Sequence, residues 1–161
     1  SETATLAQHI NEIEGVYKHR FKNGLVTGES YQSEDIIEVI RYSQDAVYFR
    51  ASLQFFNGHA CGIYGIARYA DGAFIYKSGQ VSQATPACTL KLSVDKHNLH
   101  ISDRVTANSA STCSAFCGAR GSLGHYEISR NKKRKIRYMP LILKSQQYSE
   151  AVNDYQKTSS H

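Results

Sequence analysis

Alternating apolar and polar residues dominate the middle of the chain. The clearest stretch spans residues 46–56, where one face carries only apolar side chains: Val47, Phe49, Ala51, Leu53 and Phe55. A period of two is typical of a half-buried strand. Apolar runs also indicate strands at 14–21, 35–42, 59–69, 73–77, 88–94, 99–103 and 122–129. The run at 35–42 would also suit a helical turn, but its β-branched residues favour a strand.

Turn dipeptides separate these predicted strands. Asn57-Gly58 and Asp71-Gly72 suit tight hairpins, because both central positions of a type I′ turn need positive φ. The polar stretch to Ser33 is interpreted as a loop or an irregular hairpin. Hairpins that follow one another without helices between them predict a mainly β fold, an antiparallel meander. We expect it to form a small lipocalin-like barrel or half-barrel, since closure removes exposed edges.

A short helix is predicted at each end of the chain. Residues 3–14 place apolar side chains at helical spacing, and Ser145 can cap a second helix that carries Tyr148, Ala151, Val152 and Tyr155. Residues 136–143 are expected to begin as a strand. The length of 161 residues fits a single domain, 1–161. We divide it into a helical lead-in (1–13), a barrel (14–139), a C-terminal helix (140–156) and a tail (157–161).

Four cysteines bear on the compartment more than the charge does. The net charge of +5 favours acidic partners only weakly. The cysteines Cys61, Cys88, Cys113 and Cys117 form no C-x-x-C pair, so two disulfides in an oxidising compartment are expected. No apolar run approaches the ~20 residues that a membrane helix needs. We therefore expect a periplasmic or secreted protein whose signal peptide has been removed.

The residues alone favour one disulfide pairing of the three possible. Cys61 and Cys88 both fall on apolar strand faces, and a turn could close Cys113 onto Cys117, so these two pairs rank ahead of the crossed pairings. The alternative of a reactive Cys117 with His125 and Arg120 lacks any further catalytic group. A zinc site from His59 and three of the cysteines lacks two closely spaced ligand pairs. We expect a disulfide-shaped turn that displays Arg120.

A basic run follows the last predicted strand. Six of the eight residues from Arg130 to Arg137 are Lys or Arg. The main interpretation is a solvated edge that discourages strand pairing. The alternative is an anion-binding patch for nucleic acid, lipid head groups or an acidic protein, with Lys132, Lys133, Arg134 and Lys135 as its residues.

Two resemblances bear on the class of protein. Gly15-Val16-Tyr17 resembles the Gly-x-Trp start of lipocalin-type barrels, with Tyr in place of Trp. In that family a late arginine packs over the aromatic ring, which implies Arg134 or Arg137 here.

The second resemblance spans residues 46–128. It is carried by these motifs: His59-Ala60-Cys61, Gly65-Ile66-Ala67, Cys88-Thr89-Leu90, Asp103, Cys113-x3-Cys117-Gly118 and Gly124-x-Tyr126. The order is similar to that of small, uncharacterised bacterial periplasmic β-domains, some attached to lysozyme-inhibitor-like modules. It implies two disulfides and no known catalysis. The Ser/Ala-rich loop, the basic run and the C-terminal helix are not part of that pattern.

The leading functional hypothesis is an exported, non-enzymatic binding protein of inhibitor or immunity type. Its partner surface would include Arg120, Gly121 and His125, and its partner would be a secreted or periplasmic enzyme or toxin. The alternative is a lipocalin-like carrier of a small hydrophobic ligand. The residues that would line its cavity, or equally fill a solid core, are Val47, Phe49, Leu53, Ile63, Leu90 and Leu92. We expect no cofactor, no metal and no nucleic-acid partner.

Overall fold

The computed structural model describes residues 2–78, 88–104, 110–118 and 121–159. Nine strands within these ranges form one antiparallel sheet in the order β8-β7-β6-β5-β4-β3-β2-β1-β9. The strands are β1 (Gly15–Gly24), β2 (Ser30–Arg41), β3 (Ala46–Gln54), β4 (Ala60–Ala70), β5 (Ala73–Lys77), β6 (Thr89–Val94), β7 (Asn98–Ser102), β8 (Tyr126–Ser129) and β9 (Lys133–Arg134). From β1 to β8 each strand pairs with its sequence neighbour, which confirms the predicted meander.

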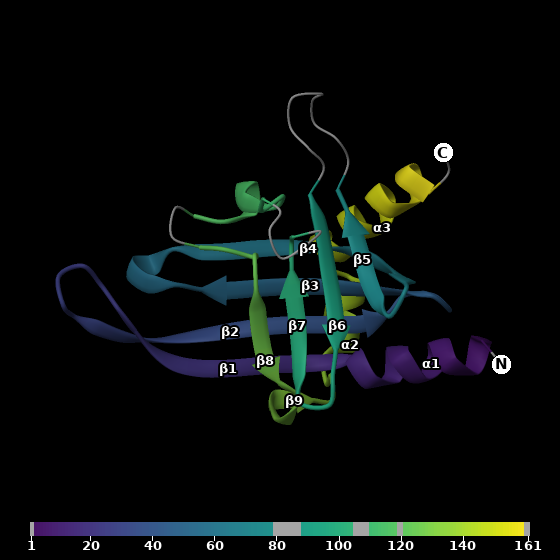
Figure 1. Ribbon diagram of the computed structural model, residues 1–161, viewed down its shortest axis with the longest axis horizontal. Coiled ribbons are helices and arrows are strands. Elements are labelled where there is room, and N and C mark those ends of the chain that lie inside the picture. The colour runs from purple at the N-terminus through teal and green to yellow at the C-terminus, as the bar shows by residue number, and fades with distance from the viewer. Residues whose placement is uncertain (1, 79–87, 105–109, 119–120, 160–161) are drawn as a thin grey trace.

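The sheet curls into a nearly closed barrel. In Figure 1 the long strands β1 to β4 run across the shorter strands β5 to β8. The helical elements are α1 (Glu2–Ile13), η1 (Phe56–Gly58), η2 (Ser114–Phe116), η3 (Arg130–Lys132), α2 (Met139–Leu143) and α3 (Gln146–Ser159). The turn η3 carries the chain from β8 to β9, which pairs with β1 through Val16↔Arg134 and Tyr17↔Lys133. The mainly β class with helices at both ends is confirmed.

The barrel interior is a hydrophobic core to which α1 also contributes. Ile10 and Ile13 of α1 are fully buried there, and the hydroxyl of Tyr17 donates to the Ile13 carbonyl at 2.8 Å. These contacts place α1 against the start of β1, as its apolar spacing indicates. The predicted helix at 3–14 is confirmed.

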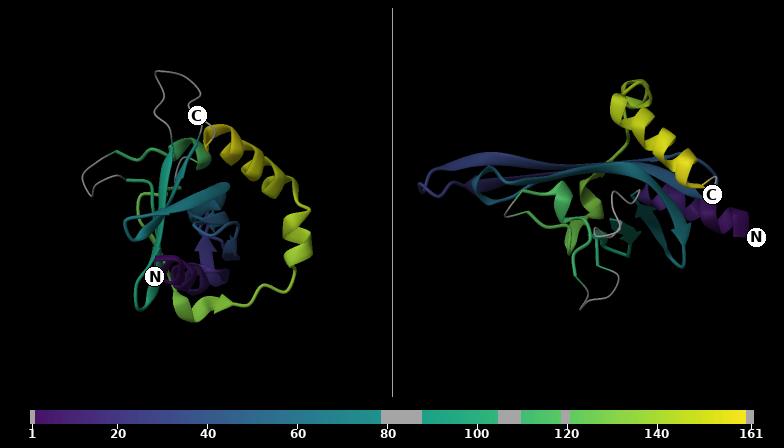
Figure 2. Two further views of the ribbon diagram at one scale, coloured as in Figure 1. Left: turned by 90° about the vertical axis from the view of Figure 1, so that its right-hand side faces the viewer. Right: turned by 90° about the horizontal axis from the view of Figure 1, so that it is seen from above.

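A second core lies outside the barrel. Tyr48 and Ile66 point away from the interior and pack beneath Ile142 of α2 and Ala151 of α3. Figure 2 shows the C-terminal segment passing around the outside of the sheet, with α3 lying over it. Strand β3 is therefore buried on both faces, which explains why its outward Tyr48 is only 1% exposed.

One local prediction is wrong, and another is decided between its two alternatives. Residues 136–143 do not begin as a strand, because the sheet ends at Arg134 and Pro140 instead starts the short helix α2. The polar stretch up to Ser33 forms a hairpin, one of the two predicted alternatives; β1 and β2 stay paired as far as Gly24↔Ser30, and the loop is confined to residues 25–29. Backbone pairing does not require apolar side chains, so the alternation of apolar residues predicted both strands to be shorter than they are. The cap on α3 is as predicted: Ser145 Oγ accepts the Tyr148 N–H at 3.2 Å.

Candidate functional site

A basic pocket lies on the outer face of β1, beside the barrel edge. On β1, Val16 and Lys18 alternate with the inward-facing Tyr17. Strand β9 sets Arg134 opposite Val16, and the chain then continues along this face towards α2. The resulting pocket has a volume of about 370 Å³ and is lined by Val16, Lys18, Arg134, Lys135, Arg137 and Tyr138.

The pocket combines four cations with an apolar floor. Arg134 is held in place, because its Nη1 donates to the carbonyls of Asn131 at 2.7 Å and Lys133 at 2.9 Å. The ion pairs between described side chains use other residues, so none of them neutralises the pocket cations. A phosphate or carboxylate group would therefore meet positive charge and arginine donors suited to bidentate binding.

Only some of the predicted anion-binding residues line this pocket. Arg134 and Lys135 line the pocket. Lys132 is exposed on η3, and Lys133 does not line the pocket. Lys133 Nζ donates to the Glu12 carbonyl at 2.7 Å, and burial, with Arg130 nearby, lowers the pKa of its ammonium group. We interpret Lys133 as a structural link between α1 and β9.

Gly15 makes the Lys133 link possible. Its φ is +152°, and a Cβ there would lie 2.6 Å from Lys133 Cγ.

The resemblance to lipocalins implies a different role for the neighbouring arginines. Arg134 and Arg137 share a pocket with Val16, on the face of β1 opposite to the Tyr17 ring, so the implied packing over Tyr17 is wrong.

Lys18 and Arg137 were not among the predicted anion-binding residues. Arg137 belongs to the basic run, but nothing in that run indicates which of its members share a surface. Lys18 lies on β1, far from the run in sequence. Its position two residues after Val16 shows which strand face it occupies, but the approach of β9 to that face is a long-range contact.

The predicted disulfide pairing is wrong. Cys61 is bonded to Cys117, and Cys88 to Cys113. Cys61 is on β4 and Cys88 immediately precedes β6, and β5 lies between these two strands. Strands two places apart are ~10 Å from each other, beyond the reach of a disulfide. The segment 113–117 instead fastens to both strands, one cysteine to each.

The disulfide-clamped turn does not gather the predicted partner surface. Arg120 lies outside the described residues. Gly121 packs against the first bridge, where a Cβ would lie 3.0 Å from Cys61 Sγ. His125 is exposed and contacts Glu127. No described contact joins Gly121 to His125, so their shared role stays a prediction.

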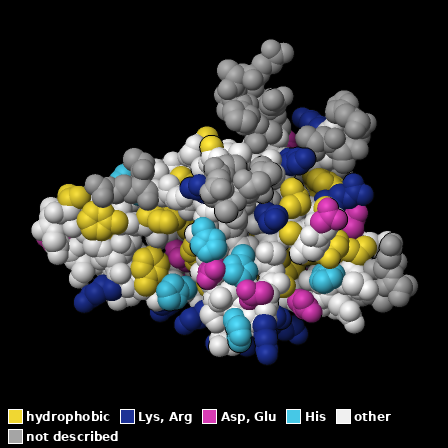
Figure 3. Space-filling view, in the orientation of Figure 1, with side chains coloured by type: hydrophobic (Ala, Val, Ile, Leu, Met, Phe, Trp, Pro, Cys, Tyr) yellow, Lys and Arg dark blue, Asp and Glu magenta, His cyan; other side chains and the backbone are white. Residues whose placement is uncertain are grey.

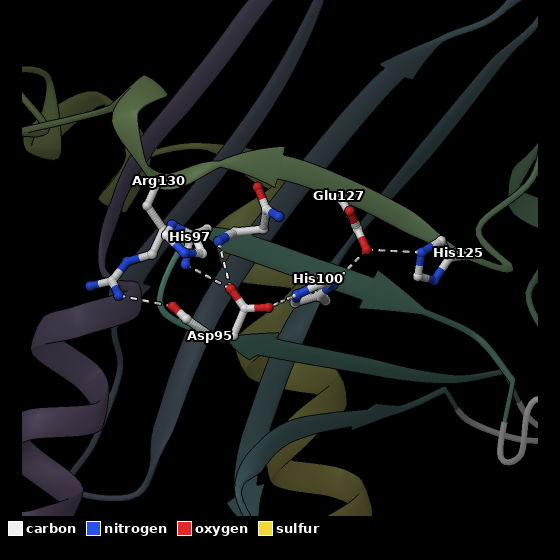
Figure 4. A network of polar contacts seen from close by, with 7 residues as sticks. Asp95, His97, His100, His125, Glu127 and Arg130 are labelled. Atoms are coloured by element: carbon white, nitrogen blue, oxygen red, sulfur yellow. Dashed lines mark hydrogen bonds and ion pairs between the residues drawn. The ribbon is translucent and has the colours of Figure 1, made fainter.

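A network of histidines and carboxylates crosses the outer face of β6 to β8 (Figures 3 and 4). His100 Nε2 lies 2.5 Å from Asp95 Oδ2, and His100 Nδ1 lies 3.2 Å from Glu127 Oε1. The same Glu127 oxygen is 3.0 Å from His125 Nε2. The register sets His100 opposite Glu127 on neighbouring strands. The sequence alone does not predict the network, because the contacts between these residues depend on this register.

Backbone contacts fix the Asp95 end of the network. Its Oδ1 accepts the N–H groups of His97 at 2.8 Å and Asn98 at 2.7 Å, and Arg130 Nη1 donates to its carbonyl at 2.9 Å. The hydrogen bond from His100, with these backbone bonds, holds the pKa of Asp95 well below its usual value. In the part of the chain that is described, no three potential metal ligands are placed to hold an ion. We interpret the network as a charge-balancing surface cluster.

A smaller pocket adjoins the basic one across Tyr138. Its volume is about 170 Å³, and Tyr138 lines both pockets. Here Glu38, only 4% exposed, is paired with Arg50 at 2.6 Å. Burial and a hydrogen bond to Glu38 raise the pKa of Tyr138, so its phenol stays neutral. The Glu38 carboxylate thus already has partners.

The residues predicted to line a ligand cavity all lie inside the barrel. Each is at most 1% exposed, and they pack in the same hydrophobic cluster: Val47, Phe49, Leu53, Ile63, Leu90 and Leu92. The ring of Phe49 also meets Tyr76 edge-on at 5.4 Å between centroids. This packing favours a filled core over an open cavity.

Comparison with known proteins found no match among family models, curated proteins or solved structures. The two family resemblances therefore stay predictions. Among the described helices, none combines the length and apolar character needed to cross a bilayer.

Proposed function

We propose that this protein is a non-enzymatic binding domain of the periplasm or another extracellular compartment, and that it recognises an anionic group of its partner. The basic pocket carries this proposal, because its four cations surround an apolar floor and no described ion pair neutralises them. The two disulfides support an oxidising environment.

Other features support a surface site without catalysis. The buried interior residues leave the outer faces for binding. In the His100 network, the described hydrogen-bond partners of both imidazoles are carboxylates, with no hydroxyl or thiol to act as a nucleophile. An inhibitor or immunity role is compatible with such a rigid scaffold, whose partner would present phosphate or carboxylate groups.

The test is calorimetric titration with pyrophosphate and with an oligoglutamate peptide. Arg134→Gln with Arg137→Gln should weaken binding at least tenfold, because charge-assisted hydrogen bonds each contribute about 1.5 kcal/mol or more. Lys91→Gln with Lys96→Gln removes the same charge from the exposed surface of β6 and its turn, and should change binding little. Equal affinities of the two double variants, or no binding of either probe by the wild type, would contradict the proposal for soluble anions.

A further inference from the structure

Two exposed leucines follow the residues of the basic pocket along the chain. Leu141 is 71% exposed and Leu143 46% exposed, both on α2. The same helix buries Ile142 against the outer core, so α2 holds its leucines away from the protein. Scattered apolar side chains on a surface are ordinary. These two are one residue apart and border a concentration of positive charge.

Along the chain, the charged residues around them are all basic. Between Glu127 and Glu150 the sequence contains no Asp or Glu, and it contains seven Lys and Arg residues. Four of these cations flank the leucines along the chain: Arg134, Lys135, Arg137 and Lys144. We call residues 134–144 the strap. The ion pairs among described side chains involve none of its cations.

The strap is an outer, convex element. Figure 2 shows it passing outside the sheet, with α2 at the far side from the barrel. Tyr138 joins the two parts of its surface, because it lines the basic pocket and also the smaller pocket bordered by Leu141. Leu141 is thus linked to the cations through Tyr138, and Leu143 is exposed on the other flank of the buried Ile142.

We propose that the strap docks this protein on a membrane surface that contains anionic phospholipid. The inference rests on the proposed anion site and adds the identity of the anion, a lipid phosphate. Cations attracted to the head groups would bring α2 to the membrane, and Leu141 and Leu143 would insert at the acyl boundary. Binding of a soluble phosphate would explain the cations but not the exposed leucines. A protein partner would need a groove to receive the convex helix, whereas a bilayer accepts it directly.

The experiment is co-sedimentation of the full chain with vesicles. One set contains phosphatidylcholine mixed with phosphatidylglycerol, and the other contains phosphatidylcholine alone. We expect the wild type to bind the mixed vesicles and not the neutral ones. Arg134→Gln with Arg137→Gln should weaken binding by about twenty-five-fold, since each cation near an anionic surface contributes about fivefold. Leu141→Gln with Leu143→Gln should weaken it at least about tenfold and leave pyrophosphate binding unchanged.

Val26→Gln is the matched apolar control. Val26 is 65% exposed in the turn between β1 and β2, and its replacement should leave vesicle binding unchanged. Pyrophosphate binding without vesicle binding would overturn the membrane inference and leave the anion site intact. Vesicle binding unaffected by the leucine substitutions would also overturn it. If a variant lacking the arginines binds both pyrophosphate and vesicles normally, the proposed function fails as well.

Discussion

At the scale of single residues, the ionisation of Asp95 makes the stability of the fold depend on pH. His100 and two backbone N–H groups hold its pKa below the usual value. A carboxylate whose pKa is lower in the folded than in the unfolded chain stabilises the fold above its unfolded pKa, near 4. That stabilisation is lost as the pH falls below about 4. Asp95 is exposed, so the effect is expected to be small.

Asp95→Asn tests this link between charge and stability. The variant should have a lower free energy of unfolding than the wild type at neutral pH, with the gap closing below about pH 4. Urea unfolding at a series of pH values measures both. Asp71→Asn serves as the control, because it removes a carboxylate from the exposed turn between β4 and β5. A gap that stays constant down to pH 2 would show that the Asp95 contacts do not depend on ionisation.

The sequence predicts single residues well where they depend on local pattern. The inward side chains of β3 follow from alternation, and Asn57 and Gly58 adopt the expected positive φ of 60° and 78°. The members of the basic pocket do not follow, because Lys18 and Arg134 meet only through the pairing of the first strand with the last. The contact between His100 and Glu127 likewise depends on a register that no local pattern records.

At the scale of elements, the segment 113–117 is the crossing point of both disulfides. One bridge closes 56 residues and the other 25. The chain-entropy account assigns them about 4 and 3.5 kcal/mol of stabilisation. Buried Asp103 supports the same segment, since its Oδ2 accepts the Cys113 N–H at 2.9 Å. Strand faces alone gave the wrong pairing, although the predicted meander already places the strand at 73–77 between the two cysteine-bearing strands, which argues against a Cys61–Cys88 bond.

Tryptic digestion without reduction distinguishes the pairings. The sequence yields peptides 51–68 with Cys61, 78–91 with Cys88, and 105–120 with both remaining cysteines. The bridges described here should link all three peptides into one species. Chymotryptic cleavage after Phe116 should then separate it into two linked pairs, with Cys61 bound to Cys117. Recovery of peptide 105–120 by itself, oxidised and unlinked, would support the pairing that the residues alone favour.

At the scale of the whole molecule, the pKa values of the tyrosines reflect their burial in the two cores. Burial raises the pKa of Tyr48 and of Tyr76 to about 12, with nearby acidic groups adding to it. Burial raises the pKa values of Tyr17, Tyr126 and Tyr138 further, and Asp35 contributes for Tyr126. Because these values exceed the unfolded value near 10, their contribution to stability is complete below pH 10 and is lost as the pH rises.

Alkaline titration followed by ultraviolet absorbance should separate two groups among the 11 tyrosines. In the unfolded chain the phenols should ionise near pH 10. The five tyrosines named above should ionise only near pH 12 or higher, or together with loss of the β-sheet signal in circular dichroism. The same titration in urea should give one transition. A single transition near pH 10 in the folded protein would contradict the two closed cores.

The meander described above also sets the order in which the chain can assemble. From β1 to β8 every pairing joins neighbours in sequence, and most of these hairpins close over short loops with a small entropic cost. The exceptions are the longer connections at 78–88 and 103–125. The pairing of β9 with β1 differs, because it joins Tyr17 to Lys133 across most of the chain. We expect this contact to form last. The basic pocket is assembled by that same contact, so the binding surface exists only once folding is complete.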